Sequence, residues 1–203
     1  MSGWHKKRRV MIRYDATAGI YDRRYAEEQS AKVEVALKNM KIEKEWLILD
    51  VGCGTGILFD HVANEAYGIV GLDFSKKCLL QAKERIRNKG PRNVQLIQAD
   101  ADNMPFRKEV FATVFAMTIL QNMPNPGETL AEIKSVSRND ALFVVSGLKK
   151  IFTKEGFEQL LKNSQLNTLM LEDEKLKCYV AVCTIPPSGQ KEIRKSHRGA
   201  LVN

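Results

Sequence analysis

No apolar run in this chain of 203 residues approaches the roughly 20 residues that a membrane-spanning helix needs. The basic first residues, MSGWHKKRRVMIRYD, also lack the apolar segment and the small-residue cleavage site of a secretory signal. These two absences favour a cytoplasmic protein without a membrane partner.

Cysteine is scarce and scattered. The four cysteines form no Cys-x-x-Cys pair, and two of them lie in apolar runs. Such residues are more often buried thiols in a reducing compartment than a disulfide framework or a zinc site. We therefore expect free thiols and no metal site at Cys53, Cys78, Cys178 and Cys183.

Acidic residues are too few to balance the basic ones. The chain has 32 lysines and arginines against 24 aspartates and glutamates, which gives a formal net charge of +8. Much of the excess lies in HKKRR near the start and KEIRKSHRG near the end. Clustered positive charge favours an anionic partner such as nucleic acid, although basic tails also occur for solubility alone.

The length suits one domain, and 44% hydrophobic residues are enough for a full core. We expect an irregular basic arm over residues 1–22 and a folded domain over 23–185. Residues 186–203, PPSGQKEIRKSHRGALVN, are polar, basic and aperiodic. This composition predicts a disordered tail.

Within the domain, apolar runs of strand length alternate with segments of helical period. Such alternation is typical of an α/β fold, a parallel sheet covered by helices on both faces. The last two strands lack a long crossover and could form an antiparallel edge hairpin. Helices are predicted over 27–37, 58–64, 76–88, 127–136 and 154–162, and strands over 46–51, 67–73, 94–99, 110–117, 141–147, 168–171 and 179–184.

Three glycines separate the strand 46–51 from the helix that follows, in the sequence DVGCGTG. Glycine has no Cβ and accepts unusual dihedral angles, so the backbone can approach a ligand closely. The following helix adds free N–H groups and a positive dipole end. In open α/β sheets, ligands bind at the carboxyl ends of the strands. The spacing is GxGxG rather than the GxGxxG of dinucleotide binders.

Acidic residues end the next two strands. Asp73, in GLDFS, could accept hydrogen bonds from both hydroxyls of a ribose. Asp100 and Asp102, in QADADNMPF, are at the position where the edge of an adenine next to that ribose would lie. Taken singly, each feature has a structural alternative: the glycines could serve packing, Asp73 could belong to a helix start capped by Ser75, and the two aspartates could form a solvated turn.

Together, in this order and spacing, the three motifs resemble those of the class I S-adenosylmethionine-dependent methyltransferases, over roughly residues 14–183. The resemblance implies a Rossmann-like, seven-stranded, mostly parallel sheet with an antiparallel edge strand and helices on both faces. It also implies that S-adenosyl-L-methionine lies over the carboxyl ends of the first four strands. Transferred residue by residue, it assigns cofactor contacts to Tyr21, Asp50, Gly52, Cys53, Gly54, Gly56, Asp73, Phe74, Asp100, Ala101 and Thr118.

The resemblance also implies roles. The glycines would form the methionine-side turn, Asp73 would hold the ribose, and Asp100 with Ala101 would flank the adenine. The segment YDATAGIYD is similar to the arm of related enzymes in which the second aromatic residue closes over the cofactor. This favours Tyr21 over Tyr14, although both could instead pack on the core.

Methyl transfer is an in-line displacement that needs positioning and exclusion of water rather than a recognisable catalytic residue. The loop after the fourth strand offers the amides of Gln121 and Asn122, which could orient a base or a carbonyl, or could simply cap a polar loop. The loop lacks the [DNS]-P-P-[YFW] motif of adenine-amine methyltransferases. It also lacks the cysteine nucleophile of RNA cytosine-C5 enzymes.

Two substrate classes compete. The basic ends favour tRNA or rRNA, and YDATAGIYDRRYAEEQ is loosely similar to the arm of rRNA guanine-N7 and tRNA-wobble methyltransferases. Several of those enzymes work with a small zinc-ribbon activator protein, which the resemblance makes a possible partner. The alternative is a small molecule, as in the similar ubiquinone/menaquinone-biosynthesis methyltransferases, although little chain follows the fifth strand to build a lid. A non-catalytic cofactor-binding scaffold is a third interpretation, which the intact motifs disfavour.

Overall fold

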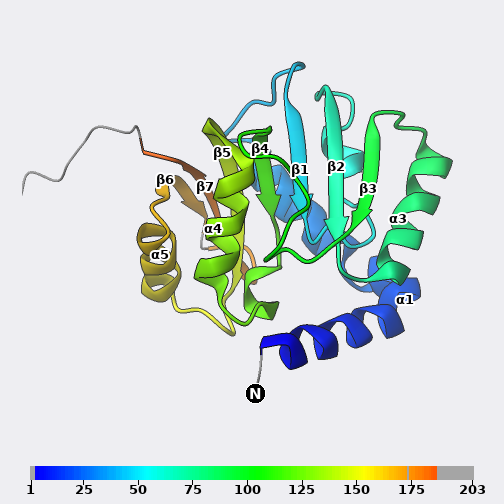
Figure 1. Ribbon diagram of the computed structural model, residues 1–203, viewed down its shortest axis with the longest axis horizontal. Helices are drawn as coiled ribbons and strands as arrows, with labels where there is room; N and C mark the ends of the chain where they lie inside the picture. The colour runs from blue at the N-terminus through cyan, green and yellow to red at the C-terminus, as the bar shows by residue number, and fades with distance from the viewer. Residues whose placement is uncertain (1–2, 173, 187–203) are drawn as a thin grey trace, which may run out of the picture.

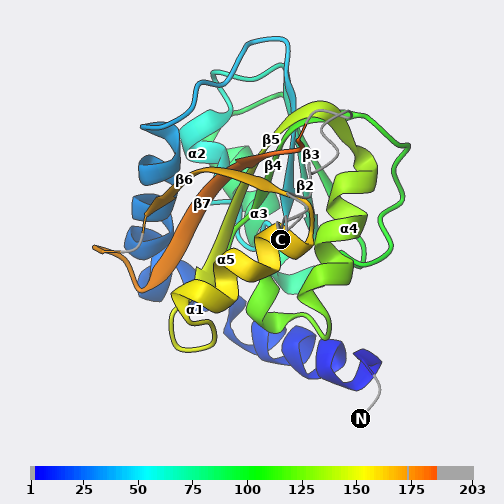
Figure 2. The ribbon, with the colours of Figure 1, turned by 90° about the vertical axis from the view of Figure 1, so that its left-hand side faces the viewer.

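The computed structural model describes residues 3–172 and 174–186. A single seven-stranded sheet crosses the molecule in the order β3-β2-β1-β4-β5-β7-β6, and helices cover both of its faces (Figures 1 and 2). The strands are β1 (Leu47–Val51), β2 (Gly68–Asp73), β3 (Val94–Gln98), β4 (Phe111–Ala116), β5 (Ser137–Leu148), β6 (Asn167–Glu172) and β7 (Cys178–Thr184). The helices are α1 (Gly3–Leu37), α2 (Phe59–Val62), α3 (Lys76–Lys89), the 3₁₀ turn η1 (Leu120–Asn122), α4 (Pro126–Val136) and α5 (Lys154–Asn163).

The sheet confirms the predicted fold class. Strand β1 pairs in parallel with β2 on one side and with β4 on the other. After β3 the chain returns across the sheet and adds β4 on the other side of β1. The strand order therefore reverses between β1 and β4, and α/β proteins bind their ligands at such a point. The expected antiparallel hairpin is present as β6 and β7. Strand β7 is the antiparallel one and inserts beside β5, so that β6 forms the edge.

Helix boundaries follow local sequence signals. The side chain of Ser75 accepts a hydrogen bond from Cys78 N at the start of α3, and Gly90 ends that helix with a φ of +83°. Asn125 caps α4 in the same manner, and Thr153 caps α5.

The core has two apolar layers, one on each face of the sheet. One layer joins the buried faces of α4 and α5 to β4 and β5, with Leu130 and Phe157 fully buried. The other joins α2, α3 and the end of α1 to the opposite face, with Phe59 and Ala82 fully buried. All four cysteines are free and buried, as expected.

Helix α1 corrects one expectation. Residues 1–22 are predicted above to be an irregular arm, but the described part of this segment belongs to one continuous helix that runs from Gly3 to Leu37. Its N-terminal half crosses beneath the carboxyl ends of the strands, and its C-terminal half packs on a face of the sheet (Figures 1 and 2). The predicted helix 27–37 is the end of this element. The predicted disordered tail lies outside the described residues apart from Pro186.

Two glycine substitutions should have opposite effects on stability. Gly19 lies within α1, where an added Cβ would meet nothing within 4 Å. Glycine inside a helix is destabilising by about 0.5–1 kcal/mol relative to alanine, so Gly19→Ala should raise the free energy of unfolding by that amount. An unchanged value would indicate that residue 19 is not helical in solution.

Gly71→Ala should lower the free energy of unfolding by about 1–3 kcal/mol, because a Cβ there overpacks the core. It would meet Phe59 Cζ at 2.7 Å, Leu96 Cδ2 at 3.0 Å and Cys53 Sγ at 3.1 Å. Urea unfolding of both variants beside the unmodified protein measures the two changes.

Candidate functional site

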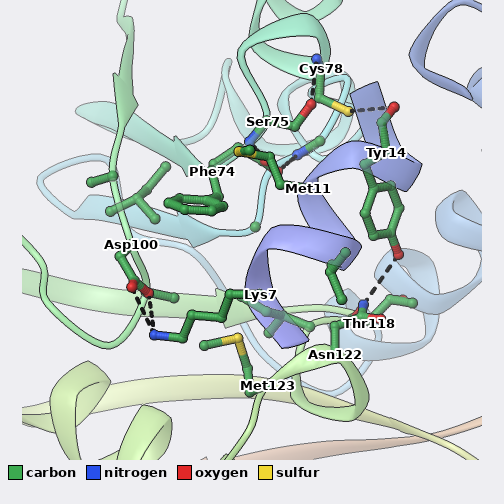
Figure 3. A pocket seen from close by; sticks show the side chains of 18 of the residues that line it. Lys7, Met11, Tyr14, Phe74, Ser75, Cys78, Asp100, Thr118, Asn122 and Met123 are labelled. Carbon is green, nitrogen blue, oxygen red and sulfur yellow. Dashed lines mark hydrogen bonds and ion pairs between the residues drawn. The ribbon is translucent and has the colours of Figure 1, made fainter. Parts of the chain in front are cut away.

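A cavity that is partly open to solvent lies between the carboxyl ends of the central strands and the N-terminal half of α1 (Figure 3). Nine of the predicted site residues line it, namely Tyr21, Gly52, Gly54, Asp73, Phe74, Asp100, Ala101, Thr118 and Asn122. Four do not: Asp50, Cys53, Gly56 and Gln121.

The glycines of the turn after β1 have different surroundings. Gly52, Gly54 and Gly56 all have positive φ, at +73°, +56° and +78°. A Cβ on Gly54 would meet nothing within 4 Å, and this residue lines the cavity, so its lack of a side chain leaves room for a ligand. A Cβ on Gly56 would collide with the ring of Phe59. The glycine at 56 therefore serves packing, which was the structural alternative for the motif.

Asp73 joins the glycine turn to the start of α3. One carboxylate oxygen accepts from Gly54 N at 2.8 Å, and the other accepts from Ser75 N at 2.7 Å. Burial raises the pKa of Asp73, and these backbone hydrogen bonds oppose the rise. Each carboxylate oxygen can accept more than one hydrogen bond, so Asp73 can still receive ribose hydroxyls from the cavity.

Asp50 and Cys53 lie behind the wall of the cavity. Asp50 is 4% exposed, and its carboxyl makes no hydrogen bond to any residue that the structure describes. Burial, with a contribution from the charge of Asp73, raises the pKa of Asp50 to about 8. Burial likewise raises the pKa of the Cys53 thiol, which makes it a poor nucleophile.

Lys7 of α1 reaches the far end of the cavity. Its Nζ lies 2.8 and 2.7 Å from the two carboxylate oxygens of Asp100 and 2.5 Å from Asp102 Oδ2 (Figure 3). Burial alone would lower the pKa of Lys7, but the two carboxylates outweigh it and raise the pKa. Sequence reasoning treated Lys7 as part of a basic, solvent-facing run and missed this ion pair, which only the continuous helix α1 makes possible.

The two candidate amides separate in space. Gln121 Nε2 donates to the carbonyl of Thr118 at 2.7 Å, and its Oε1 is buried without a hydrogen-bond partner in the described structure. Gln121 does not line the cavity, so the structure does not support a role for it in orienting a substrate there. Asn122 does line the cavity and donates to Tyr14 Oη at 3.2 Å. The rings of Tyr14 and Tyr21, both in the cavity wall, lie 6.1 Å apart.

The family model for a methyltransferase domain matches residues 42–196. The chain belongs to this methyltransferase family. Together with the fold, the match makes the domain a class I, S-adenosylmethionine-dependent methyltransferase domain, as the three motifs predicted.

Comparison with known proteins gives partial matches in sequence and more complete matches in structure. The ubiquinone biosynthesis O-methyltransferase of Photobacterium profundum is 30% identical over 120 residues, which are 57% of this chain and 51% of that protein. This chain spans about half the length, or less, of the first curated relatives that it matches.

A putative S-adenosyl-L-methionine-dependent methyltransferase from Methanococcus maripaludis is 14% identical with a TM-score of 0.72, covering 89% of this chain and 94% of that one. A putative methyltransferase from Haloferax volcanii, solved in complex with the Trm112 methyltransferase activator, is 15% identical with a TM-score of 0.70, covering 85% and 97%. At these identities the two structures establish the fold.

S-adenosyl-L-methionine, the cofactor of this family, fits the residues present. Gly54 leaves open space at the wall, Asp73 offers acceptors for ribose hydroxyls, and Phe74 offers an aromatic face. No group of three or more metal-binding side chains occurs in the part of the chain that the structure describes. The described helices include none that is long and apolar enough to cross a membrane.

Asp73→Ala should weaken binding of S-adenosylmethionine by roughly ten- to a hundredfold, because hydrogen bonds from ribose to a carboxylate contribute about 1.5–3 kcal/mol. Asp73→Asn should lose less, since the amide oxygen can still accept one bond. Isothermal titration calorimetry measures both affinities, with Asp140→Ala, an exposed aspartate paired with Arg138, as the control. Equal affinity in Asp73→Ala and the control would remove the ribose assignment.

Asp50 should make the stability of the fold depend on pH. Its folded pKa of about 8 lies above the ordinary value of 3.8, so the folded state holds a proton that the unfolded chain has already released. The resulting stability is present below pH 4 and is lost as the pH rises toward 8, at up to about 1.4 kcal/mol per pH unit. Asp50→Asn should remove this pH dependence of the free energy of unfolding, measured with urea from pH 5 to 9. Parallel pH profiles for the variant and the unmodified protein would contradict the prediction.

Proposed function

We propose that the protein methylates a nucleotide of tRNA or rRNA with S-adenosyl-L-methionine. The observation that carries the proposal is the basic, partly aromatic surface of α1 that borders the cavity. Arg8 and Arg9 are exposed there, and Trp4 is 54% exposed while its ring edge contacts Phe74, at 5.8 Å between centroids. Cationic side chains that contact phosphates and aromatic rings that stack on bases are the usual elements of single-stranded RNA binding.

Not every basic residue of HKKRR is available for RNA. Lys6 Nζ donates to the carbonyl of Met123, and Lys7 pairs with Asp100. Of this run, Arg8 and Arg9 are therefore the proposed phosphate contacts. Arg13 extends the surface to the cavity edge, where it donates to Asn122 Oδ1 at 2.9 Å.

The cofactor, when bound, supplies an activated methyl group, so the chain has to bind, orient and shield the acceptor. Asn122 is the amide that lies in the cavity, and we propose that it orients the acceptor base. Helix α1 forms one wall of the cavity and shields that side from water. The Haloferax neighbour supports a second part of the proposal, that a small zinc-ribbon activator protein assists this chain as well.

A small-molecule acceptor is the alternative, and two observations favour it. Part of the cavity wall is apolar, with Met11, Met117, Ile119 and Met123. The relative from Photobacterium profundum is named as an O-methyltransferase of ubiquinone biosynthesis. A planar, apolar ring could use the same wall.

RNA binding at several salt concentrations distinguishes the two acceptors. Replacing Arg8 and Arg9 together by alanine should weaken binding of all sequences alike and should reduce the salt slope by about 1.4–1.8, at about 0.7–0.9 per phosphate contact. Cofactor affinity should not change.

The matched control replaces Arg107 and Lys108, an exposed basic pair that precedes β4 and so lies toward the opposite end of the strands. This double variant should keep the salt slope of the unmodified protein. Undetectable or salt-independent RNA binding by the unmodified protein, with and without a zinc-ribbon activator, would favour the small-molecule acceptor.

A further inference from the structure

Helix α1 contains a buried lysine that the cofactor motifs leave unexplained. Lys32 is 1% exposed, lies in the C-terminal half of α1 and is not part of the cavity wall. Its Nζ pairs with Glu28 Oε1 at 3.0 Å and donates to Thr118 Oγ1 at 3.2 Å. The Cys178 thiol also interacts with Lys32. A buried ammonium group is costly unless it is paired and hydrogen-bonded, so these partners are part of its explanation. Thr118, however, faces the cavity.

The ammonium group sets the direction of a chain of hydrogen bonds, because it can only donate. Since Thr118 Oγ1 accepts from Lys32, its own proton goes to Gln29 Oε1 at 3.1 Å. This orients the amide, whose Nε2 then donates to the hydroxyl of Tyr21 at 3.3 Å.

The chain ends in the cavity. The Tyr21 hydroxyl accepts from Gln29, and its own proton has no acceptor among the residues that the structure describes. Tyr21 lines the cavity, so this proton is available to a ligand. Burial raises the pKa of Tyr21, and the hydroxyl therefore stays protonated at neutral pH. Hydrogen bonds in a chain polarise one another, and a cation at the start strengthens the donor at the end.

The charges of the cavity indicate which ligand group needs this donor. Lys7 is the only cation among the described wall residues, and Asp100 and Asp102 already neutralise it. Asp73 and Asp100 would repel a carboxylate from the ends of β2 and β3. A bound carboxylate is therefore left with the side of β1 and β4, where it must be held by neutral donors.

We propose that Lys32 is a positioning residue that, through Thr118 and Gln29, fixes the Tyr21 hydroxyl as a hydrogen-bond donor to the methionine carboxylate of the bound cofactor. Lys32, Gln29 and Tyr21 all precede residue 42, where the match to the family model begins. The donor chain belongs to the cofactor side of the cavity, so its test does not depend on the identity of the methyl acceptor.

The test compares two ligands by isothermal titration calorimetry. S-adenosylhomocysteine carries the methionine-type carboxylate, whereas 5′-methylthioadenosine shares the adenosine and lacks the amino-acid end. Tyr21→Phe and Lys32→Met should each weaken the binding of S-adenosylhomocysteine by roughly tenfold or more, which is the usual effect of losing a hydrogen bond to a charged group. Both variants should bind 5′-methylthioadenosine within about twofold of the unmodified protein.

Lys177→Met is the matched control. Lys177 also lies near Glu28, with 3.5 Å between Nζ and Oε2, but it is exposed and makes no contact with Thr118. This variant should leave both affinities unchanged, which separates loss of a cation near Glu28 from loss of the donor chain.

Three results would overturn the proposal. If a variant binds both ligands more weakly by the same factor, its residue has a merely structural role. Unchanged affinity of Tyr21→Phe for S-adenosylhomocysteine would rule out the proposed contact with the carboxylate. An effect of Tyr21→Phe without an effect of a folded Lys32→Met would remove the positioning role of Lys32. If Lys32→Met does not fold, Gln29→Leu takes its place, because it breaks the same chain between Thr118 and Tyr21 and leaves Lys32 paired with Glu28.

Discussion

The site depends on the docking of α1 across the carboxyl ends of the parallel strands, because this helix forms one wall of the cavity. Polar contacts hold it there. Among the described residues in the N-terminal half of α1, only Ala18 is buried. Further along the helix, Val33 and Ala36 bury apolar surface. Polar side chains of α1 bind to several places in the fold instead. Among these contacts are Lys7 with Asp100, Asp15 Oδ1 with Ser75 Oγ, Asp22 Oδ1 with Thr55 Oγ1 and, in the C-terminal half, Lys32 with Thr118.

This division of α1 has consequences for ligand entry. A partly exposed hydrogen bond or ion pair contributes only about 1 kcal/mol, whereas burial of apolar side chains fixes the C-terminal half to the sheet. The N-terminal half can therefore open at a lower free energy than the whole domain unfolds. Opening would release Lys7 from Asp100 and would expose an acceptor at the end of the cavity where the nucleobase is expected.

The sequence predicts the sheet well because its signals are local. Apolar runs, capping residues and the glycine turn each depend on a few neighbouring positions, and the order of the three motifs points to the edge of the sheet where the cavity lies. The irregular arm was a wrong prediction because the partners of α1, such as Ser75 and Thr55, are distant in sequence. Lys32 was missed because lysine is almost never fully buried. One signal was available in the sequence: Lys32 lies four residues after Glu28, with which it can pair on a helix, and near the apolar Val33 and Ala36.

Thr118 shows why the cofactor side and the acceptor side of the cavity cannot be understood separately. It has a φ of +61°, a conformation that is uncommon for a β-branched residue and that costs free energy. Every polar group of the residue is used: its N–H donates to Ser146 Oγ at 2.7 Å, its carbonyl accepts from Gln121 and Asn122, and its hydroxyl joins Lys32 to Gln29. Asn122, which we propose to orient the acceptor, and Tyr21, which we propose to contact the cofactor through the chain from Gln29, thus share one strained anchor at the end of β4. A shift of Thr118 would displace both side chains together, so with the proposed roles this residue would couple the position of the acceptor to that of the cofactor.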